Sequence, residues 1–373
     1  MKRIILIIEI IYTLIINFAL VYKRMSPYLS NFIKALSKEI TSEIPIYCTG
    51  YPESEFIENY IIQYKLKPEK VNLILNNKNY SIIEQMGFDA ISIWDFRRGK
   101  GGYILNDQIR VDGWGRLYKG NWYMWDGVFK SEEIIDNWEH LNLPSEENLM
   151  NLRSFLDTTN HNLEFVISLP GLFEKTWQSM GIKFFAKCLN KDISFIEKVL
   201  HFFSNYLNTL IQKIQRTGAT TFLIADDIGY KKRTFISKER WRKLFFDEYK
   251  KIIDIIHQKK HYVILHSDGY ISDMISTFID LGFDALQSLE PSSGVDIFSL
   301  FKKFKNQICF IGNLDMSLLT FGTPQEVKDY TKKLISKAKE YNCPLVISPS
   351  QQINRKCDPK NINAIIETAK IFK

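Results

Sequence analysis

The sequence predicts an α/β fold, a (β/α)8 TIM barrel, and two observations predict it. Short apolar runs rich in valine, isoleucine and phenylalanine recur along the 373 residues, and each ends in polar or small residues. Amphipathic segments with helical spacing separate the later runs. Buried strands that alternate with helices build a parallel sheet, and eight of them indicate a closed barrel rather than an open sheet.

The eight expected strands are spread over most of the chain. In order, they lie at residues 44–48, 90–95, 164–171, 220–227, 261–269, 284–291, 308–315 and 344–352. Helical patterns between the later ones cover residues 238–258, 272–281 and 324–341, with glycine or asparagine near several ends. A barrel of this length is a normal single domain.

An insertion follows the second expected strand, at residues 96–161. It contains GKGGYILNDQIRVDGWGRLYKGNWYMWDG, whose alternation and glycines are typical of a hairpin. Because it follows a strand at the catalytic end of the barrel, we expect a hairpin region that could act as a lid. Its aromatic residues, such as Trp114 and Trp122, either line a flat substrate or pack the insertion onto the barrel. Packing is favoured, since aromatic side chains mostly serve burial.

An apolar run at residues 4–22 lies between basic pairs. It is near the minimum length for a membrane span, and one acid and one amide interrupt it. Met25 begins MSPYLSNFIKALSKE, which has the pattern of an amphipathic helix. We therefore interpret residues 1–24 as an extension from a misassigned start, in preference to a weak anchor. The barrel is assigned to residues 25–373, and membrane association is expected only if the extension is real.

Composition narrows the class of protein. With 45% hydrophobic and 24% charged residues, the chain is globular. The net charge of +7 comes from lysines and arginines that are spread along the chain, so nucleic acid is not an expected partner. Five cysteines form an odd set without a CxxC pair, which indicates neither a disulfide framework nor a cysteine-rich zinc site. A cytoplasmic protein is expected.

Polar residues end the expected strands, and this is where a barrel carries its functional groups. The ends supply mainly acids and amides, with one histidine: Asp95, Asp226, Asp227, His266, Asp268, Glu290, Asn313, Asp315, Ser350 and Gln351. We find no Walker A loop and no GxGxxG after a strand, which leaves metal binding or acid/base work by carboxylates.

Within this set His266 and Asp268 are two residues apart, so on a strand they would project to the same side. Together with Glu290 and Gln351 they favour a site. The competing interpretation is helix capping, which we expect for Asp227, Asp315 and Ser350 taken one at a time.

Four blocks of the C-terminal half together resemble the uroporphyrinogen decarboxylase superfamily. They read FLIADDIGYKKRTFISKERWRKLFFDEYKKII, VILHSDGYISDMISTFIDLGFDALQSLEP, FIGNLDMSLLTFGTPQEVKDYTKKLI and VISPSQQI followed by DPKNINAII. Their order and spacing cover roughly residues 220 to 368. MSPYLSNFIKALSKE with the following IPIY resembles the family's start, which supports Met25 as the functional start. The superfamily includes the decarboxylase of haem synthesis and the corrinoid (cobalamin) dependent methyltransferases.

The methyltransferase members carry a zinc site made by H-x-C after the fifth strand and a cysteine after the eighth. This chain keeps His266, has Asp268 in place of the first cysteine and has Gln351 at the last position. The resemblance therefore implies an oxygen-rich site for Zn2+ or another divalent metal, with Glu290 as a further ligand. A metal-free site that hydrogen-bonds a ligand directly is the alternative; the metal is slightly favoured, because paired N/O donors are a usual ligand set.

The decarboxylase members carry an aspartate after the second strand, which Asp95 matches, and an arginine-bearing first loop. Here that loop reads CTGYPESEF, which has no arginine and two glutamates. Arg97 and Arg98, just after Asp95, could replace it as an anion clamp for substrate. The tyrosine of those enzymes after the third strand is also missing from LPGLFEKTW.

The leading hypothesis is a corrinoid-dependent methyltransferase that moves a methyl group to or from a corrinoid carrier, with a small corrinoid protein as partner. Asp95, Asp226 and His266 are the expected catalytic residues, and Asp95 and Asp226 would also orient the substrate. The alternatives are a uroporphyrinogen (tetrapyrrole) decarboxylase with Asp95 as its central acid, and a non-catalytic module that binds a tetrapyrrole or corrinoid. The sequence names neither methyl donor nor acceptor, nor an oligomeric state.

Overall fold

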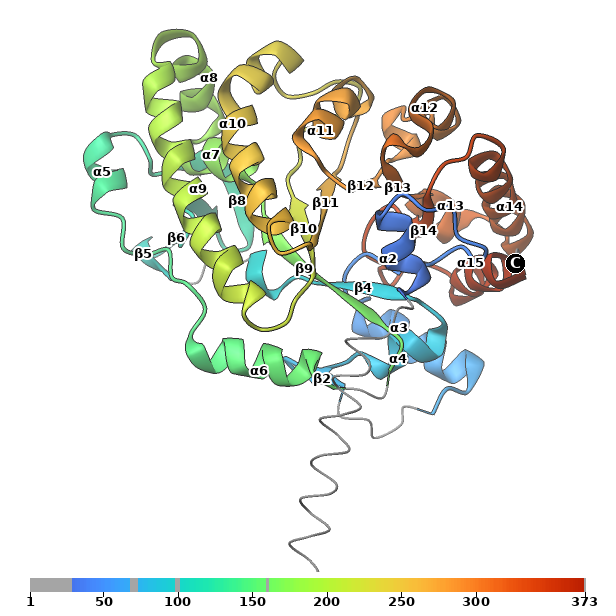
Figure 1. Ribbon diagram of the computed structural model, residues 1–373. Helices are drawn as coiled ribbons and strands as arrows, with labels where there is room; N and C mark the ends of the chain where they lie inside the picture. The colour runs from blue at the N-terminus through green and yellow to red at the C-terminus, as the bar shows by residue number, and fades with distance from the viewer. Residues whose placement is uncertain (1–28, 68–72, 98–100, 159–160, 372–373) are drawn as a thin grey trace, which may run out of the picture.

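A parallel eight-stranded sheet forms the centre of the protein (Figure 1). The computed structural model describes residues 29–67, 73–97, 101–158 and 161–371. Sheet order follows chain order, and a parallel bridge between Ile46 and Ile347 joins the first strand to the last. The sheet therefore closes on itself, which confirms the predicted (β/α)8 barrel.

The barrel strands fall within the eight expected runs. They are β1 (Tyr47–Cys48), β4 (Ala90–Ile93), β9 (Glu164–Pro170), β10 (Thr221–Ala225), β11 (Tyr262–Ser267), β12 (Ala285–Ser288), β13 (Cys309–Leu314) and β14 (Leu345–Pro349). The other strands are β2 (Ile74–Leu75), β3 (Lys78–Asn79), β5 (Gly102–Asn106), β6 (Ile109–Asp112), β7 (Arg116–Lys119) and β8 (Trp122–Gly127). Most of the polar residues that end the runs lie just past the strands, in the loops at their carboxyl ends.

Helices surround the barrel, with α8 to α10 on one side and α12 to α15 on the other (Figure 1). The α-helices are α2 (Asn31–Leu36), α3 (Ser54–Tyr64), α4 (Ser81–Met86), α5 (Glu132–Asp136), α6 (Glu146–Leu156), α7 (Leu172–Met180), α8 (Ile182–Lys191), α9 (Ile193–Gln215), α10 (Lys238–His257), α11 (Ile275–Leu281), α12 (Ile297–Phe304), α13 (Met316–Phe321), α14 (Pro324–Glu340) and α15 (Pro359–Ile371). Short 3-10 turns are η1 (Asp95–Arg97), η2 (Ser272–Met274), η3 (Pro291–Ser293) and η4 (Lys305–Gln307).

Each barrel strand divides its side chains between two apolar cores. In β10, Leu223 and Ala225 join the cluster inside the barrel, whereas Phe222 and Ile224 join the larger cluster under the helices. This follows from the two-residue period of a strand. Phe32 of α2 belongs to the inner cluster too, so α2 closes the end of the barrel where the strands begin. The functional groups are left to the opposite end.

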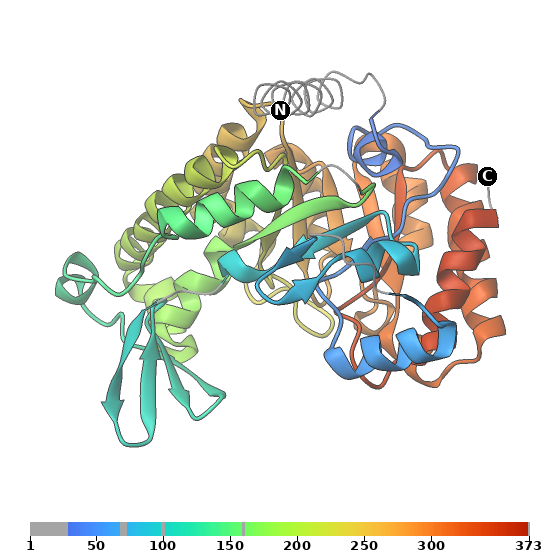
Figure 2. The same cartoon turned by 90° about the horizontal axis from the view of Figure 1, so that it is seen from below.

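The predicted insertion contains a four-stranded antiparallel sheet, β5 to β8, which projects from the body of the barrel at the lower left of Figure 2. It is anchored through α7: the Phe129 amide donates to the Ser179 carbonyl at 2.9 Å, and a Cβ on Gly127 would lie 2.0 Å from that oxygen. Trp114 is buried against Phe203, as packing predicts, but Trp122 is 72% exposed. A role as a lid stays a prediction.

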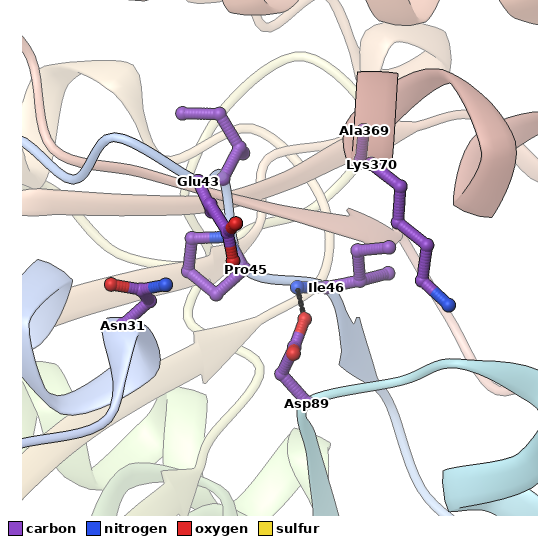
Figure 3. Close-up of a pocket in the computed structure, with 8 residues that line it drawn as sticks. Asn31, Glu43, Pro45, Ile46, Asp89, Ala369 and Lys370 are labelled. Carbon is purple, nitrogen blue, oxygen red and sulfur yellow. Dashed lines mark hydrogen bonds between the residues drawn. The ribbon is translucent and has the colours of Figure 1, made fainter. Parts of the chain in front are cut away.

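Two aspartates tie neighbouring strands together where the strands begin. Asp89 accepts the amide of Ile46 at 2.7 Å, beside a cavity of about 320 Å3 that Figure 3 shows. Asp284 accepts the amide of Val263 at 2.8 Å. Both lie in the sequence GFDA, and in both cases the glycine ends a short helix with a positive φ. Such an aspartate has a structural role, because a buried backbone amide near the start of a strand needs an acceptor.

The extension predicted at residues 1–24 lies outside the described ranges. Within those ranges we find no helix that is both long and apolar enough to span a bilayer.

Candidate metal centre

His266 and Asp268 lie at the carboxyl end of β11, as the sequence predicts. His266 is the last strand residue but one and is 7% exposed; Asp268 follows the strand. Nε2 of His266 lies 3.6 Å from Oδ1 of Asp268, too long for a hydrogen bond and suited to a shared partner. The hydroxyl of Ser288, at the end of β12, donates to the same oxygen of Asp268 at 2.9 Å. The structure therefore brings the predicted pair together.

A third ligand candidate comes from the neighbouring strand. Asp227 follows β10, and its Oδ1 accepts the amide of Asp268 at 2.9 Å. Asp227, His266 and Asp268 each offer a ligand atom, and the three atoms all lie within 4.8 Å of one another. We expected Asp227 to cap a helix, and the structure differs. Capping is confirmed for Asp315, which accepts the amide of Ser317 at 2.8 Å.

The electrostatics of this cluster favour a cation. The pKa of Asp227 is raised to about 6, first by burial and then by the negative charges of Glu174 and Asp268. His266 and the Asp268 amide act in the opposite direction but do not cancel it. A carboxylate whose charge is opposed by burial and by like charges gains most from a positive partner. Glu174, at the start of α7, was missed because it lies in a helix rather than at a strand end.

Glu290 and Gln351 lie beside the cluster but are engaged with each other. The Gln351 amide nitrogen donates to Glu290 Oε1 at 2.8 Å and approaches Asp268 Oδ2 at 3.4 Å. Oε2 of Glu290 accepts the amide of Gly269 at 2.9 Å and the hydroxyl of Ser293 at 3.0 Å. Among the described residues, the close group of ligand atoms contains Asp227 and does not contain Glu290. A ligand role for Glu290 or Gln351 stays a prediction.

Two glycines let the loops after β10 and β11 meet. A Cβ on Gly229 would lie 2.5 Å from the carbonyl oxygen of Asp268, and one on Gly269 would lie 2.7 Å from the carbonyl carbon of Gly229. Gly269 also has a φ of +81°, which disfavours any side chain. The close crossing brings the Asp227 loop to the Asp268 loop, so these glycines help to bring the candidate ligands together.

Asp226 was predicted to orient substrate, but its carboxylate is buried and bound by groups of the protein itself. It is 0% exposed, and its carboxylate accepts the amides of Phe173 at 3.0 Å and Glu174 at 2.7 Å, together with the hydroxyl of Tyr249. Burial raises its pKa well above the ordinary value, and the charge of Glu174 adds to this. Gly171 leaves room for it, since a Cβ there would lie 2.0 Å from the Cβ of Asp226. A direct catalytic role for Asp226 stays a prediction without support from these contacts.

Asp95 lies in η1, at the edge of a cavity of about 400 Å3. Four asparagines share the lining of this cavity: Asn76, Asn142, Asn148 and Asn151. Oδ2 of Asp95 is buried and has no hydrogen-bond partner among the described residues. The lining includes none of the residues around His266. Of the predicted anion clamp, Arg98 lies outside the described residues, and Arg97 is described only as the last position of η1.

The C-terminal part of the chain decides its family. The sequence profile described as Uroporphyrinogen decarboxylase (URO-D) matches residues 175–372, more than half of the chain. The chain belongs to the uroporphyrinogen decarboxylase family. The matched region contains Asp227, His266 and Asp268, so the candidate metal centre lies within the part that defines this family. A comparison with curated protein sequences gives no significant match.

Solved structures show how far the likeness in fold extends. A methyltransferase from Methanosarcina mazei is similar over 92% of this chain and 98% of its own, with a TM-score of 0.66 and 16% identity. A B12-independent methionine synthase from Shewanella covers 88% of this chain and 97% of its own, with a TM-score of 0.40 and 14% identity. At 16% identity the likeness to the Methanosarcina protein shows the fold alone. This uroporphyrinogen decarboxylase family member thus has the barrel of a known methyltransferase along nearly its whole length.

Proposed function

We propose that this chain is a metal-dependent methyltransferase that acts with a corrinoid carrier. The observation that carries the proposal is the convergence of Asp227, His266 and Asp268 at the carboxyl ends of β10 and β11. One imidazole and two carboxylates form a ligand set suited to zinc or another divalent ion, and their two negative charges match its charge. Three protein ligands leave a further position for substrate.

We assign different roles to the residues of the site. Asp227, His266 and Asp268 would hold the ion, while Gln351 and Ser288 keep the Asp268 carboxylate in place by donating hydrogen bonds to it. A bound zinc ion would supply Lewis-acid chemistry that lowers the pKa of a thiol. In the overall reaction, the thiol sulfur takes the methyl group from the methyl-corrinoid and loses its proton. The products are a methyl thioether, a proton and the corrinoid, which keeps both electrons of the cobalt–carbon bond and is thereby reduced by two electrons.

The decarboxylase alternative has less support. Uroporphyrinogen carries many carboxylates, and the loop after β1 offers Glu53 and Glu55 where an arginine would be needed. Asp95, the expected pyrrole ligand, lines a cavity that does not include the His266 group.

Zinc binding and methyl transfer test the proposal together. Metal-free protein would be titrated with zinc against a chromophoric chelator, and then incubated with methylcobalamin and a small thiol. We expect one zinc ion per chain. We also expect His266→Ala and Asp268→Ala each to weaken zinc binding by at least about 100-fold, beyond the usual effect of an outer hydrogen-bonding partner, and to abolish demethylation.

His201→Ala is a matched control, because that histidine side chain is 62% exposed on α9. Absence of zinc binding in the parent, or equal binding in His266→Ala, would reject the metal centre. Corrinoid binding without turnover of methylcobalamin would support the non-catalytic module instead, and a product of uroporphyrinogen with fewer carboxylates would support the decarboxylase.

A further inference from the structure

Gln287 is a buried polar side chain that the proposed reaction does not use directly. It is 0% exposed in β12, where its register partner in β11 is His266. Its carboxamide contacts three groups: Nδ1 of His266, the hydroxyl of Thr49 at 2.9 Å and the carbonyl of Ser350 at 3.3 Å. A fully buried amide must have its hydrogen bonds met in one orientation, and these contacts decide which.

The carbonyl of Ser350 fixes the direction of the amide. A backbone carbonyl only accepts, so the end of the Gln287 side chain that faces it must be the NH2 group. The Thr49 hydroxyl is consistent with this orientation of the Gln287 amide. It can accept a hydrogen bond from the NH2 group while it donates one to the Pro349 carbonyl at 3.2 Å. The other end, Oε1, therefore faces Nδ1 of His266. Oε1 only accepts, so Nδ1 must carry a hydrogen.

With the hydrogen on Nδ1, a neutral His266 has its lone pair on Nε2, the nitrogen that faces Asp268 Oδ1 at 3.6 Å. We propose that Gln287 is a positioning residue that holds His266 in the Nδ1–H tautomer, so that Nε2 is presented to a divalent metal together with Asp227 and Asp268. The inference rests on the proposed metal centre for its purpose, but the tautomer itself can be measured without any metal.

A second histidine of the barrel shows the opposite arrangement. Nε2 of His257 lies 3.0 Å from the carboxylate of Asp284, at the end of the barrel where the strands begin. A metal-binding histidine usually donates the N–H of its other ring nitrogen to an oxygen acceptor. Oε1 of Gln287 supplies such an acceptor at Nδ1 of His266 and leaves Nε2 on the side of Asp268.

The experiment is a measurement of histidine tautomers by NMR. Two-bond correlation spectra of metal-free protein with 15N-labelled histidine distinguish the two tautomers, and the chain has six histidines, so its spectrum is simple. His266→Gln identifies the signal. We expect the Nδ1–H pattern in the parent, a mixed or Nε2–H pattern in Gln287→Leu, and recovery of Nδ1–H in Gln287→Glu, which restores an acceptor.

Zinc affinity is the second measurement. We expect Gln287→Leu to bind zinc about 10- to 100-fold more weakly, as for the loss of other outer partners, and Gln287→Glu to recover most of the affinity. An Nε2–H pattern in the parent, or an unchanged pattern in a folded Gln287→Leu, would overturn the inference. The parent spectrum stays decisive even if Gln287→Leu does not fold.

The two proposals can fail separately. A parent that binds no zinc rejects the metal centre, and the parent tautomer still tests the inference about Gln287. A parent that binds zinc but shows the Nε2–H tautomer rejects the inference and leaves the metal centre standing.

Discussion

Aspartates at the two ends of the barrel differ in what they contact, although they are the same residue type next to the same kind of strand. Where the strands begin, Asp89 and Asp284 each accept a backbone amide of the neighbouring strand. Where the strands end, Asp227 and Asp268 converge on His266 and on each other. The first pair is satisfied by the fold, whereas the second places like charges together. Convergence, rather than position at a strand end, is therefore what marks a site.

Asp226 tests this distinction most severely, because it is adjacent to Asp227 but belongs with the structural aspartates. Asp226→Ala would remove the acceptor of the Glu174 amide and leave the Phe173 amide with only the longer contact to the Tyr249 hydroxyl at 3.3 Å. We expect a loss of about 3–5 kcal/mol in the free energy of unfolding, measured in urea. Asp227→Ala should change it by no more than about 1 kcal/mol, because its removal also relieves like-charge repulsion. Equal losses for the two variants would contradict the comparison.

Asp284 and Asp268 sharpen the comparison from opposite ends of the barrel. Asp284→Ala removes the acceptor of the Val263 amide and the partner of His257, so we expect a loss of about 1–3 kcal/mol in stability. The zinc affinity of Asp284→Ala should equal that of the parent. Asp268→Ala should show the reverse, with weakened zinc binding in the titration described above. A fall in zinc affinity for Asp284→Ala would mean that the two ends are not independent.

Replacement of Asp315 has the smallest expected effect on stability, and this effect depends on pH. Burial opposes its charge, but the hydroxyl and amide of Ser317 outweigh burial, with help from Ser292, and lower its pKa. A lowered pKa in the folded state stabilises the fold above about pH 4 and loses that contribution as pH falls below it. We expect Asp315→Ala to cost about 1 kcal/mol at neutral pH, the usual value of a helix cap. A stability difference that grows as pH falls below about 4 would be inconsistent with this sign.

Most of the barrel could be predicted from the sequence, because each strand is a local apolar run and its period is short. His266 and Asp268 could be predicted for the same reason, since two residues on one strand share a side. Asp226 and Asp227 could not be told apart, because β10 ends at Ala225 and the loop after it decides which carboxylate turns inward. Pairing across strands was equally inaccessible: nothing local in β12 indicates that Gln287 faces His266.

The sequence GFDA occurs at the start of β4 and again at the start of β12, and its two copies lie four places apart in the closed ring of eight strands. The two copies therefore lie in opposite halves of the ring, and in each the aspartate accepts a backbone amide near the start of the preceding strand. Counted from the amide that each aspartate accepts, Thr49 stands in the first half where His266 stands in the second. The equivalent position of the first half thus carries a hydroxyl where the second carries an imidazole, and Thr49 reaches the candidate metal centre through Gln287.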